Sequence, residues 1–497
     1  MKDILKSWID KPEQCALKYD ASCISYRELL LLSCQLGNLF NQYKYEKILF
    51  CIPNMPSLVI CYLAGWLSGK TLLPVNPRLT NHELLKIIDE HQPDFILFEE
   101  TRLLNKNNQF FLGDGEIYTI KNDAAKVGTF WDALLIQEKT MPIGYDPNAL
   151  TIHLTSGTTG CYKSVPHTLS QIEQYAVRRS KDFEYRLDDR ILIVTSLNHA
   201  FSFSYQFLPA IVLGLSITLI PSFSPKVVYD AMIKHKITSL ALLPVMSYQL
   251  AQYAQDKKQK YLLRYVLVAG DALPAAFNDL FMENFGAQLF LGIGMTEVFG
   301  YAQNFISNTK TGSAGLLLEG VQLKIIDKTG QVLRNNEVGE IYLKTEMNLS
   351  NYGNDISLTK NFITKDGWLK TGDIGYLDND NFLWFMGRKK QIIIKGGSNI
   401  SPAEVEQALY KDPNILEAGV IGKKDDIWGQ VIWAYISIKA NITFDESALI
   451  SFLANYIAKY KIPQKILLLA SLPKTSSGKI DRNQLIEWAE QANDATK

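Results

Sequence analysis

Residues 155–164 read TSGTTGCYKS and directly follow an apolar run, ALTIHL at 149–154. Glycines and hydroxyl side chains between Thr155 and Gly160 make a loop rich in hydrogen-bond donors. Such a loop can wrap phosphate oxygens, and Lys163 adds positive charge. It is not a Walker loop, because Gly160 stands three residues before Lys163 instead of adjoining it. The stretch is therefore interpreted either as a strand leading into a phosphate-binding loop or as a Ser/Thr-rich surface turn.

The sequence before this stretch alternates helical patterns with short apolar runs. Helices are predicted over 26–40, 57–67 and 81–91, and strands over 47–52, from 71 to 74 and over 94–98. This rhythm is typical of βαβ units with mainly parallel sheets. We therefore expect a large α/β domain.

The pattern of predicted secondary structure changes from Gly339 onward. Short β-rich runs separated by turn residues indicate a smaller antiparallel region up to Arg388. After Pro402 the pattern predicts a small α+β domain, with a helix over 403–411, strands over 417–422 and 431–439, and a helix over 447–460. The charged run at 387–391 is the expected linker. The prediction is a large N-terminal domain over 1–389 and a small mobile C-terminal domain over 390–497.

Composition excludes several classes of protein. The 497 residues exceed one typical domain, and a formal net charge of zero gives no general attraction to nucleic acid or acidic membranes. The six cysteines form no CxxC pair, so reduced thiols are expected. The apolar segment 201–221 is broken by Pro209 and Gly214, which predicts a buried strand-helix-strand and no membrane span. The N-terminus has no secretory pattern, so a cytoplasmic protein is expected.

Four further stretches carry chemistry-bearing residues. They are GIGMTE at 292–297, WLKTGD at 368–373, the segment from GR at 387–388 to GG at 396–397, and PKTSSGKI at 473–480. With residues 155–164 they make the chain resemble the adenylate-forming superfamily of acyl- and aryl-CoA ligases, peptide-synthetase adenylation domains and beetle luciferases. GGSNISPAEVE at 396–406 is most similar to the CoA-ligase branch, such as 4-coumarate-, benzoate- and succinylbenzoate-CoA ligases.

The resemblance implies an ATP-dependent ligase that forms an acyl-AMP and then transfers the acyl group to coenzyme A. It assigns Lys479 as the catalytic lysine, Thr296 to the α-phosphate and Glu297 to Mg²⁺. Asp373 and Arg388 would contact the ribose. The phosphate-binding loop would be formed by Thr155, Ser156, Gly157, Thr158, Thr159, Gly160 and Lys163. Attack of a carboxylate on the α-phosphate brings two anions together. The positive charge and hydrogen-bond donors of these residues suit that reaction.

The resemblance also implies a hinge and an acyl pocket. Lys390 matches the hinge about which the small domain swings, and Gly396 and Gly397 would let a pantetheine arm pass close to the backbone. His199 matches a gate beside the acyl pocket; a core histidine with a backbone partner is the alternative. Ser202 and Tyr205 would belong to the same pocket. Its other walls would be formed by residues that the resemblance also assigns to cofactor binding: Gly270, Asp271, Ala272, Gly292, Ile293 and Gly294.

Three positions depart from the family's usual pattern. Tyr162 and Ser164 replace a proline and a glycine, which changes the freedom of the loop backbone. Ile293 replaces an aromatic ring that would stack on adenine.

Two other functions stay open: a stand-alone adenylation enzyme that loads an acyl carrier protein, and a non-catalytic binder of acyl groups or nucleotides. A monomer or homodimer is expected, and a pocket segment without a carboxylate, 198–206, predicts an acid without an α-ammonium group.

Overall fold

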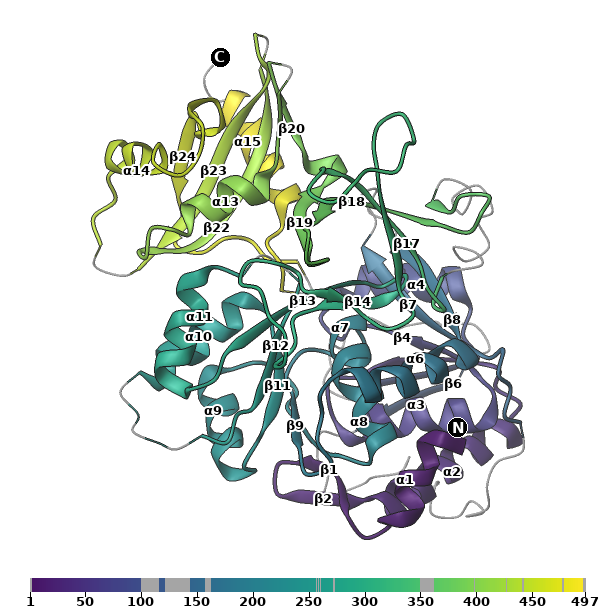
Figure 1. Cartoon of the computed structure of the whole chain (residues 1–497). Coiled ribbons are helices and arrows are strands. Elements are labelled where there is room, and N and C mark those ends of the chain that lie inside the picture. The colour runs from purple at the N-terminus through teal and green to yellow at the C-terminus, as the bar shows by residue number, and fades with distance from the viewer. Residues whose placement is uncertain are drawn as a thin grey trace.

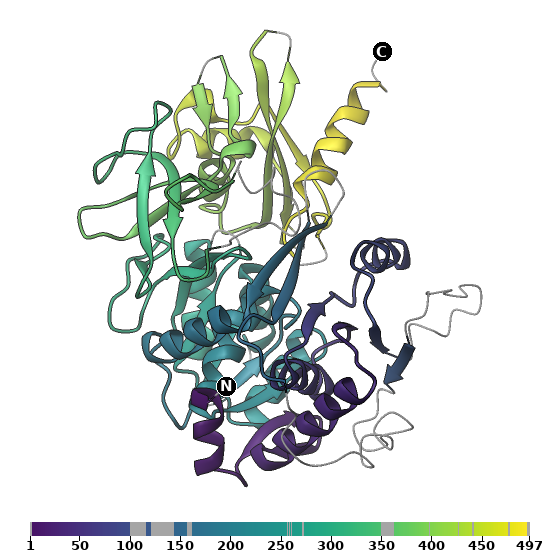
Figure 2. The same cartoon turned by 90° about the vertical axis from the view of Figure 1, so that its right-hand side faces the viewer.

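The computed structural model describes residues 2–99, 116–120, 144–156, 162–255, 257, 259, 261–270, 273–348, 362–396, 398–425, 427–439, 442–475 and 478–494. The chain forms a large body, and a smaller body lies across one end of it (Figure 1). The smaller body runs from β20 (Ile393–Lys395) to α15 (Arg482–Asp494). The view turned by 90° shows the same arrangement (Figure 2). The predicted fold class, a large α/β domain with a small C-terminal domain, is confirmed.

One sheet of the large body has the predicted alternation of strands and helices. In the described part of the chain its order is β6-β5-β3-β4-β7-β8, with parallel neighbours except for the antiparallel pair β7 and β8. The strands are β3 (Lys47–Cys51), β4 (Thr71–Pro74), β5 (Phe95–Glu99), β6 (Glu116–Ile120), β7 (Leu150–Ser156) and β8 (Tyr162–Thr168). The helices α2 (Tyr26–Gln42), α3 (Pro56–Ser68) and α4 (Asn81–His91) alternate with them along the chain.

A second sheet of the large body runs in the order β15-β14-β13-β12-β11-β9-β10-β1-β2 over the described residues. Its middle strands are parallel, and β2, β14 and β15 are antiparallel edges. The strands are β1 (Cys15–Tyr19), β2 (Ser22–Ser25), β9 (Arg190–Ile193), β10 (Ser216–Leu219), β11 (Ser239–Leu242), β12 (Tyr265–Val268), β13 (Leu289–Met295), β14 (Phe299–Gln303) and β15 (Leu316–Leu317). Its helices are α1 (Lys2–Asp10), α6 (Leu169–Asp182), α9 (Pro225–Lys234), α10 (Pro244–Ala254) and α11 (Ala275–Phe285).

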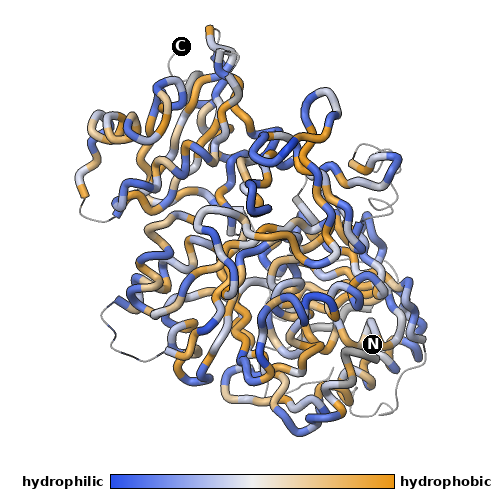
Figure 3. Tube along the Cα trace, viewed as in Figure 1, coloured by the Kyte–Doolittle hydropathy of each residue, from blue (hydrophilic) through white to orange (hydrophobic). Residues whose placement is uncertain are grey.

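The two sheets share one apolar core, to which α3 contributes along its whole length because every residue of that helix is buried. Tyr62 and Trp66 of α3 meet the ring of Phe203, with ring centroids 5.1 and 6.0 Å away. Large aromatic side chains bury much area and so fix how the layers meet. The hydropathy-coloured trace shows apolar segments concentrated inside the large body (Figure 3).

The segment 201–221 differs from its prediction. Instead of strand-helix-strand it begins with α7 (Ala200–Ser202), a π-helical turn η2 (Phe203–Phe207) and α8 (Leu208–Leu213), and only then forms β10. Pro209 is tolerated because it lies in the first turn of α8, and Gly214 ends that helix with φ of 66°. Within the described ranges, no helix is long and apolar enough to cross a membrane.

The C-terminal part contains two mainly antiparallel sheets separated by the turn η3 (Lys389–Gln391). The first has β16 (Gln322–Ile326), β17 (Gly339–Lys344), β18 (Leu369–Leu377) and β19 (Leu383–Arg388). The second has β20, β21 (Ser398–Ile400), β22 (Ile415–Asp425), β23 (Gly429–Ile438) and β24 (Lys465–Leu468), with α13 (Pro402–Leu409), α14 (Glu446–Leu453) and α15.

The last predicted helix is too long. It was expected over 447–460, but α14 ends at Leu453 and the chain continues to a short turn, η4 (Lys459–Lys461). Ala458 and Ile462 have extended backbone on either side of that turn. Just after the helix end, the side-chain amide of Asn455 donates to the carbonyl oxygens of Ser451 and Phe452, which have no N–H partner inside the helix in its last turn. The helical pattern of apolar residues in the sequence therefore extends beyond Leu453, where the helix ends.

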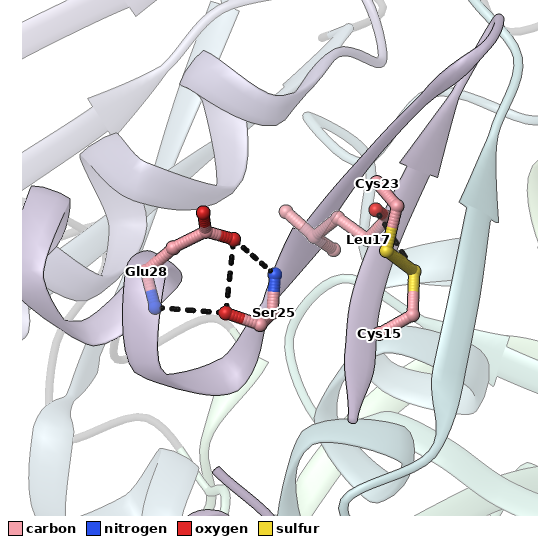
Figure 4. The surroundings of a disulfide bond; sticks show 5 residues. All are labelled: Cys15, Leu17, Cys23, Ser25 and Glu28. Atoms are coloured by element: carbon pink, nitrogen blue, oxygen red, sulfur yellow. Dashed lines mark hydrogen bonds between the residues drawn. A yellow bond between two sulfur atoms is a disulfide. The ribbon is translucent and has the colours of Figure 1, made fainter. Parts of the chain in front are cut away.

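The cysteines also differ from the prediction of reduced thiols. Cys15 and Cys23 form a disulfide across the β1–β2 hairpin, just before the capping box of Ser25 and Glu28 that begins α2 (Figure 4). The hairpin brings the two Cα atoms to 5.9 Å, within the usual range for a disulfide. Of the other described cysteines, Cys34, Cys51 and Cys61 are buried and are not disulfide-bonded.

Candidate active site

A cavity of about 1070 Å³ lies between the large and small bodies. Most of the predicted site residues that the structure describes line it, although they come from distant parts of the sequence. These are Thr155, Lys163, His199, Tyr205, Gly270, Gly292, Ile293, Gly294, Thr296, Glu297, Asp373, Arg388, Lys390 and Lys479. Gly157, Thr158, Thr159, Gly160, Asp271, Ala272 and Gly397 lie outside the described residues. The fold thus gathers one site at the carboxyl ends of parallel strands.

Asp373 and Arg388 form an ion pair on adjacent strands. They are register partners on β18 and β19, and Nε of Arg388 lies 2.8 Å from Oδ1 of Asp373. Asp373 is only 1% exposed, and Tyr301 donates to its Oδ2 over 3.4 Å. Burial raises the pKa of Asp373 to about 6, although the Arg388 guanidinium favours the charged form. Glu297 also raises that pKa, which places its charge near Asp373.

Thr296 and Glu297 stand on the tight turn between β13 and β14. The N–H of Val298 donates to the carbonyl oxygen of Met295 over 3.3 Å, and Phe299 then has φ of 58°. For a bulky side chain this is a strained backbone conformation. Gly294 permits the turn, since a β-carbon there would lie 2.7 Å from the carbonyl oxygen of Phe299. The turn therefore holds both candidate phosphate-site residues at the end of a parallel strand.

Two buried histidines, His153 and His167, lie behind this turn, and no sequence motif singles them out. Nε2 of His167 lies 2.9 Å from the carbonyl oxygen of Thr296, so this nitrogen must carry the proton that donates. His153 lies beside it, with ring centroids 6.3 Å apart. Burial lowers the pKa of His167 to about 4 and that of His153 well below its usual range. Both rings are therefore neutral at physiological pH.

Lys479 reaches this cavity from the small body. A β-carbon at Gly270 would lie 3.3 Å from Cε of Lys479, so the lysine stem passes directly over Gly270. The loop that presents it is closed by the N–H of Thr475, which donates to the carbonyl oxygen of Lys479 over 2.8 Å. The positive charge of Lys479 lowers the pKa values of both His199 and Asp373. The small body is thus seated with its lysine inside the site.

His199 is held by a residue that sequence reasoning missed. The side-chain amide of Asn76 meets Nε2 of His199 at 2.9 Å, while Oδ1 of Asn76 accepts from the backbone N–H of Arg78 over 3.0 Å. Burial, followed by the charges of Lys479 and Arg78, lowers the pKa of His199 to about 4. The histidine at the cavity wall is therefore a neutral imidazole beside two cations.

Of Ser202 and Tyr205, which were predicted beside His199, only Tyr205 lines the cavity. Its hydroxyl donates to the carbonyl oxygen of Ile293 over 2.8 Å, which ties η2 to β13. Ser202 is fully buried and does not line the cavity. Its hydroxyl contacts that of Thr195 and donates to Oε1 of Gln206 over 3.0 Å. These contacts direct the Ser202 hydroxyl to Thr195 and to the buried Gln206 instead of to the cavity.

The ends of the predicted phosphate loop are paired across β7 and β8. Thr155 is opposite Lys163, and Ser156 is opposite Tyr162. Nζ of Lys163 lies 4.6 Å from the ring centroid of Phe362, a cation–π contact at the cavity wall. The strand pair therefore brings the lysine to the start of the loop.

The two departures from the usual loop pattern, Tyr162 and Ser164, contact helix α4. The hydroxyl of Tyr162 donates to Oε1 of Glu83 over 2.9 Å. The hydroxyl of Ser164 meets Nε2 of His91 at 2.9 Å. Glu83 also closes the capping box that begins α4. Tyr162 and Ser164 thus attach this end of β8 to both ends of α4. A proline and a glycine at these positions would have no hydroxyl to make these contacts.

Gly396 and Lys390 lie at the junction of the two bodies. Lys390 belongs to η3, which lines the cavity. Gly396 does not line it; it has φ of 54° and its N–H donates to the carbonyl oxygen of Trp428 over 2.8 Å. A β-carbon at Gly396 would lie 2.9 Å from the ring of Trp428. Two roles stay predictions: that Lys390 is the hinge, and that Gly396 lets a pantetheine arm pass close to the backbone.

Comparison with known proteins gives a consistent assignment. A family described as AMP-binding enzyme matches residues 6–352, and one described as AMP-binding enzyme C-terminal domain matches residues 404–479. The 2-succinylbenzoate–CoA ligase of Bacillus subtilis is 30% identical over 95% of each chain. The indoleacetate–CoA ligase of Aromatoleum aromaticum is 28% identical over 97% of each chain. The structure of o-succinylbenzoate CoA synthetase from Bacillus subtilis with its acyl-adenylate has a TM-score of 0.83, at 28% identity over 97% of each chain.

Proposed function

This chain belongs to the AMP-binding enzyme family as an AMP-forming acid–thiol ligase, and we propose that the acid it activates has an aryl or apolar acyl tail. In the first step a carboxylate oxygen bonds to the α-phosphorus of ATP and pyrophosphate leaves. In the second step the thiol sulfur of coenzyme A bonds to the acyl carbon, the thiol loses its proton, and AMP leaves. Both steps require a site that stabilises negative charge.

The observation that carries the proposal is the entry of Lys479 into the cavity that Asp373, Thr296 and Glu297 line. A carboxylate and a triphosphate repel one another, and an ammonium group between them reduces that repulsion. Lys479 is therefore assigned to the adenylation step. Arg388 keeps Asp373 ready to accept from ribose hydroxyls, since it opposes the effect of burial on that carboxyl.

Glu297 is assigned to Mg²⁺ on the chemistry of its surroundings. Magnesium is usually held by one or two carboxylates together with substrate phosphates, so a single glutamate at the phosphate site suits it. Glu297 lines the cavity on the same turn as Thr296. Among the described residues no group of three or more His, Cys, Asp or Glu side chains surrounds a cation position. When bound, the ion would neutralise phosphate charge, and Glu297 would orient it.

The apolar part of the cavity supports the choice of acid. Its walls include Val194, Phe201, Leu243, Met246, Ile293 and Phe299. The segment 198–206 contains no carboxylate that would pair with a substrate ammonium group. Burial of an unpaired ammonium group costs several kcal/mol, so α-amino acids should be poor substrates.

A pyrophosphate-release screen tests this function. Purified protein with Mg²⁺ and ATP is given phenylpropanoate, benzoate, octanoate, a dicarboxylic acid, phenylalanine or leucine, each with and without coenzyme A. The expected result is release with at least one of phenylpropanoate, benzoate and octanoate, less release with the dicarboxylic acid, and a thioester product only when coenzyme A is present. Faster release with phenylalanine or leucine would overturn the choice of acid.

A companion assay replaces coenzyme A with a holo acyl carrier protein. Transfer to the carrier in place of coenzyme A would favour the stand-alone adenylation enzyme. Complete absence of pyrophosphate release, with ATP still bound, would favour the non-catalytic binder.

A further inference from the structure

The turn that holds Thr296 and Glu297 is strained, and something must keep it in shape. Phe299 closes the turn with φ of 58°, a left-handed backbone conformation that is strained for a bulky side chain. Backbone of this kind persists only where the surroundings hold it. The rings of Tyr175, His167, His153 and Phe203 pack on Phe299, and the hydroxyl of Tyr175 accepts from the N–H of Gly300 over 3.2 Å.

His167 contacts both ends of this turn. At one end its Nε2–H donates to the carbonyl oxygen of Thr296 over 2.9 Å. At the other end its ring lies against that of Phe299, with centroids 4.5 Å apart. The side chain of His167 is fully buried and its position is fixed by β8, where it is the register partner of Thr151 on β7. Lys163 lies on the same face of β8, because side chains alternate along a strand.

We propose that His167 is a positioning residue for the adenylation step, which holds the turn carrying Thr296 and Glu297 in the shape that receives the phosphates of Mg·ATP. The inference rests on the proposed function, since it requires those phosphates to lie at Thr296. It makes β8 a rigid connection between two phosphate-binding elements, with Lys163 near one end and His167 near the other. Misplacement of a binding group by about 1 Å can cost about a hundredfold in rate.

His153 provides a natural control within the same core. It is 1% exposed, lies 6.3 Å from His167 between ring centroids, and also packs on Phe299 at 5.7 Å. Yet neither of its ring nitrogens has a hydrogen-bond partner among the residues that the structure describes, whereas Nε2 of His167 donates to the carbonyl oxygen of Thr296. Two histidines of the same kind, in the same place, thus differ in the one contact that the proposal requires.

The test compares His167→Gln with His167→Met. The two replacement side chains have similar length and flexibility, but only glutamine carries an N–H donor where Nε2 stood. Binding of Mg·ATP is measured by isothermal titration calorimetry, which needs no acid substrate, and each protein's melting temperature is measured beside it. Glutamine should bind within about threefold of wild type, and methionine about tenfold more weakly or worse, as expected for one lost hydrogen bond. The KM for the acid should change by less than about twofold in both.

The same pair of replacements at His153 should leave Mg·ATP binding within about twofold of wild type, since no contact to the turn is lost. Equal affinities of His167→Gln and His167→Met at similar melting temperatures would overturn the proposal. So would an equal weakening at His153. The nearly isosteric pair His167→Asn and His167→Leu repeats the comparison if either longer side chain prevents folding. If wild-type protein fails to bind Mg·ATP, the proposed function is wrong and not this inference.

Discussion

Asn76 donates a hydrogen bond from its side-chain amide to Nε2 of His199 across 2.9 Å. The direction is set by the other end of the amide, where Oδ1 accepts from the N–H of Arg78. A nitrogen that accepts carries no proton, so His199 is a neutral imidazole with its proton on Nδ1. Its pKa of about 4, lowered first by burial, agrees with that tautomer. The cavity wall therefore presents a fixed tautomer, which no sequence motif reveals.

Asn76→Asp should reverse this arrangement. A carboxylate at that position accepts from Nε2 and favours the imidazolium, so the pKa of His199 should rise from about 4 towards or above its ordinary value. Wild-type adenylation should show no inflection from His199 above pH 5, whereas the variant should gain one between pH 5 and 8. Pyrophosphate release measured against pH, with an NMR titration of the histidines, checks this. Asn76→Leu, which adds no charge, should gain no inflection in that range.

Lys479→Ala should abolish adenylate formation and spare the second half-reaction. The lysine stem lies over Gly270, and under the proposed function its charge would meet the phosphates there. Loss of one such stabilising group costs about a hundred- to a thousandfold in rate. The two halves are measured separately, by pyrophosphate release and by thioester formation from a supplied acyl-AMP. Equal loss in both would contradict the idea that the small body takes two positions.

Lys390→Pro should have the opposite effect. Lys390 lies in the short turn between the last strand of the large body and the first strand of the small one. Proline fixes φ and removes a donor, so a pivot at this residue would lock. Adenylation should persist within about threefold, and thioester formation should fall about tenfold or more. Lys390→Ala, which leaves the backbone free, is the control; wild-type rates in the proline variant would place the pivot elsewhere.

Tyr162→Phe should alter ATP handling and leave α4 intact. It removes only the hydroxyl that donates to Glu83, while Glu83 still caps the helix through Thr80. A shift of about two- to tenfold in the KM for ATP is expected from one lost hydrogen bond near the loop. Thr80→Ala is the matched control, because it weakens the same cap, lowers the melting temperature, and should leave that KM unchanged.

The double replacement Tyr162→Pro with Ser164→Gly restores the usual loop pattern but also removes both contacts to α4. It should leave the fold intact and change the ATP step by a larger factor than Tyr162→Phe. ATP kinetics that match wild type in the double variant would mean that neither the backbone freedom nor the contacts matter.

Strong periodic segments allowed much of the fold to be predicted. The helix predicted over 81–91 is α4 itself, because Thr80 and Glu83 form a capping box that the sequence displays. The segment 201–221 was misjudged because an apolar run has the same appearance in a strand and in a buried helix. The disulfide was missed for a related reason, since the closeness of Cys15 and Cys23 depends on the β1–β2 hairpin.

The candidate site was predictable where motifs carry it and not where packing does. Asp373, Arg388 and Lys479 stand in recognisable stretches, and the structure brings them to one cavity. His167 and Asn76 act through single hydrogen bonds to residues more than a hundred positions away, so no local pattern could identify them. Ser202 was placed in the pocket because the sequence does not show which face of its helix looks inward.

The π-helical turn η2 has a consequence for how the acid preference of this enzyme can diverge. Such a turn contains one residue more than an α-helical turn needs, so deletion of a single residue within 203–207 converts it to ordinary helix. Each residue in an α-helix accounts for about 100° of rotation. One deletion would therefore swing Phe201 and its neighbours around the helix axis while the seat of α8 in the core is kept. The shape of the pocket can therefore change through the loss of one codon as well as through gradual replacement of side chains.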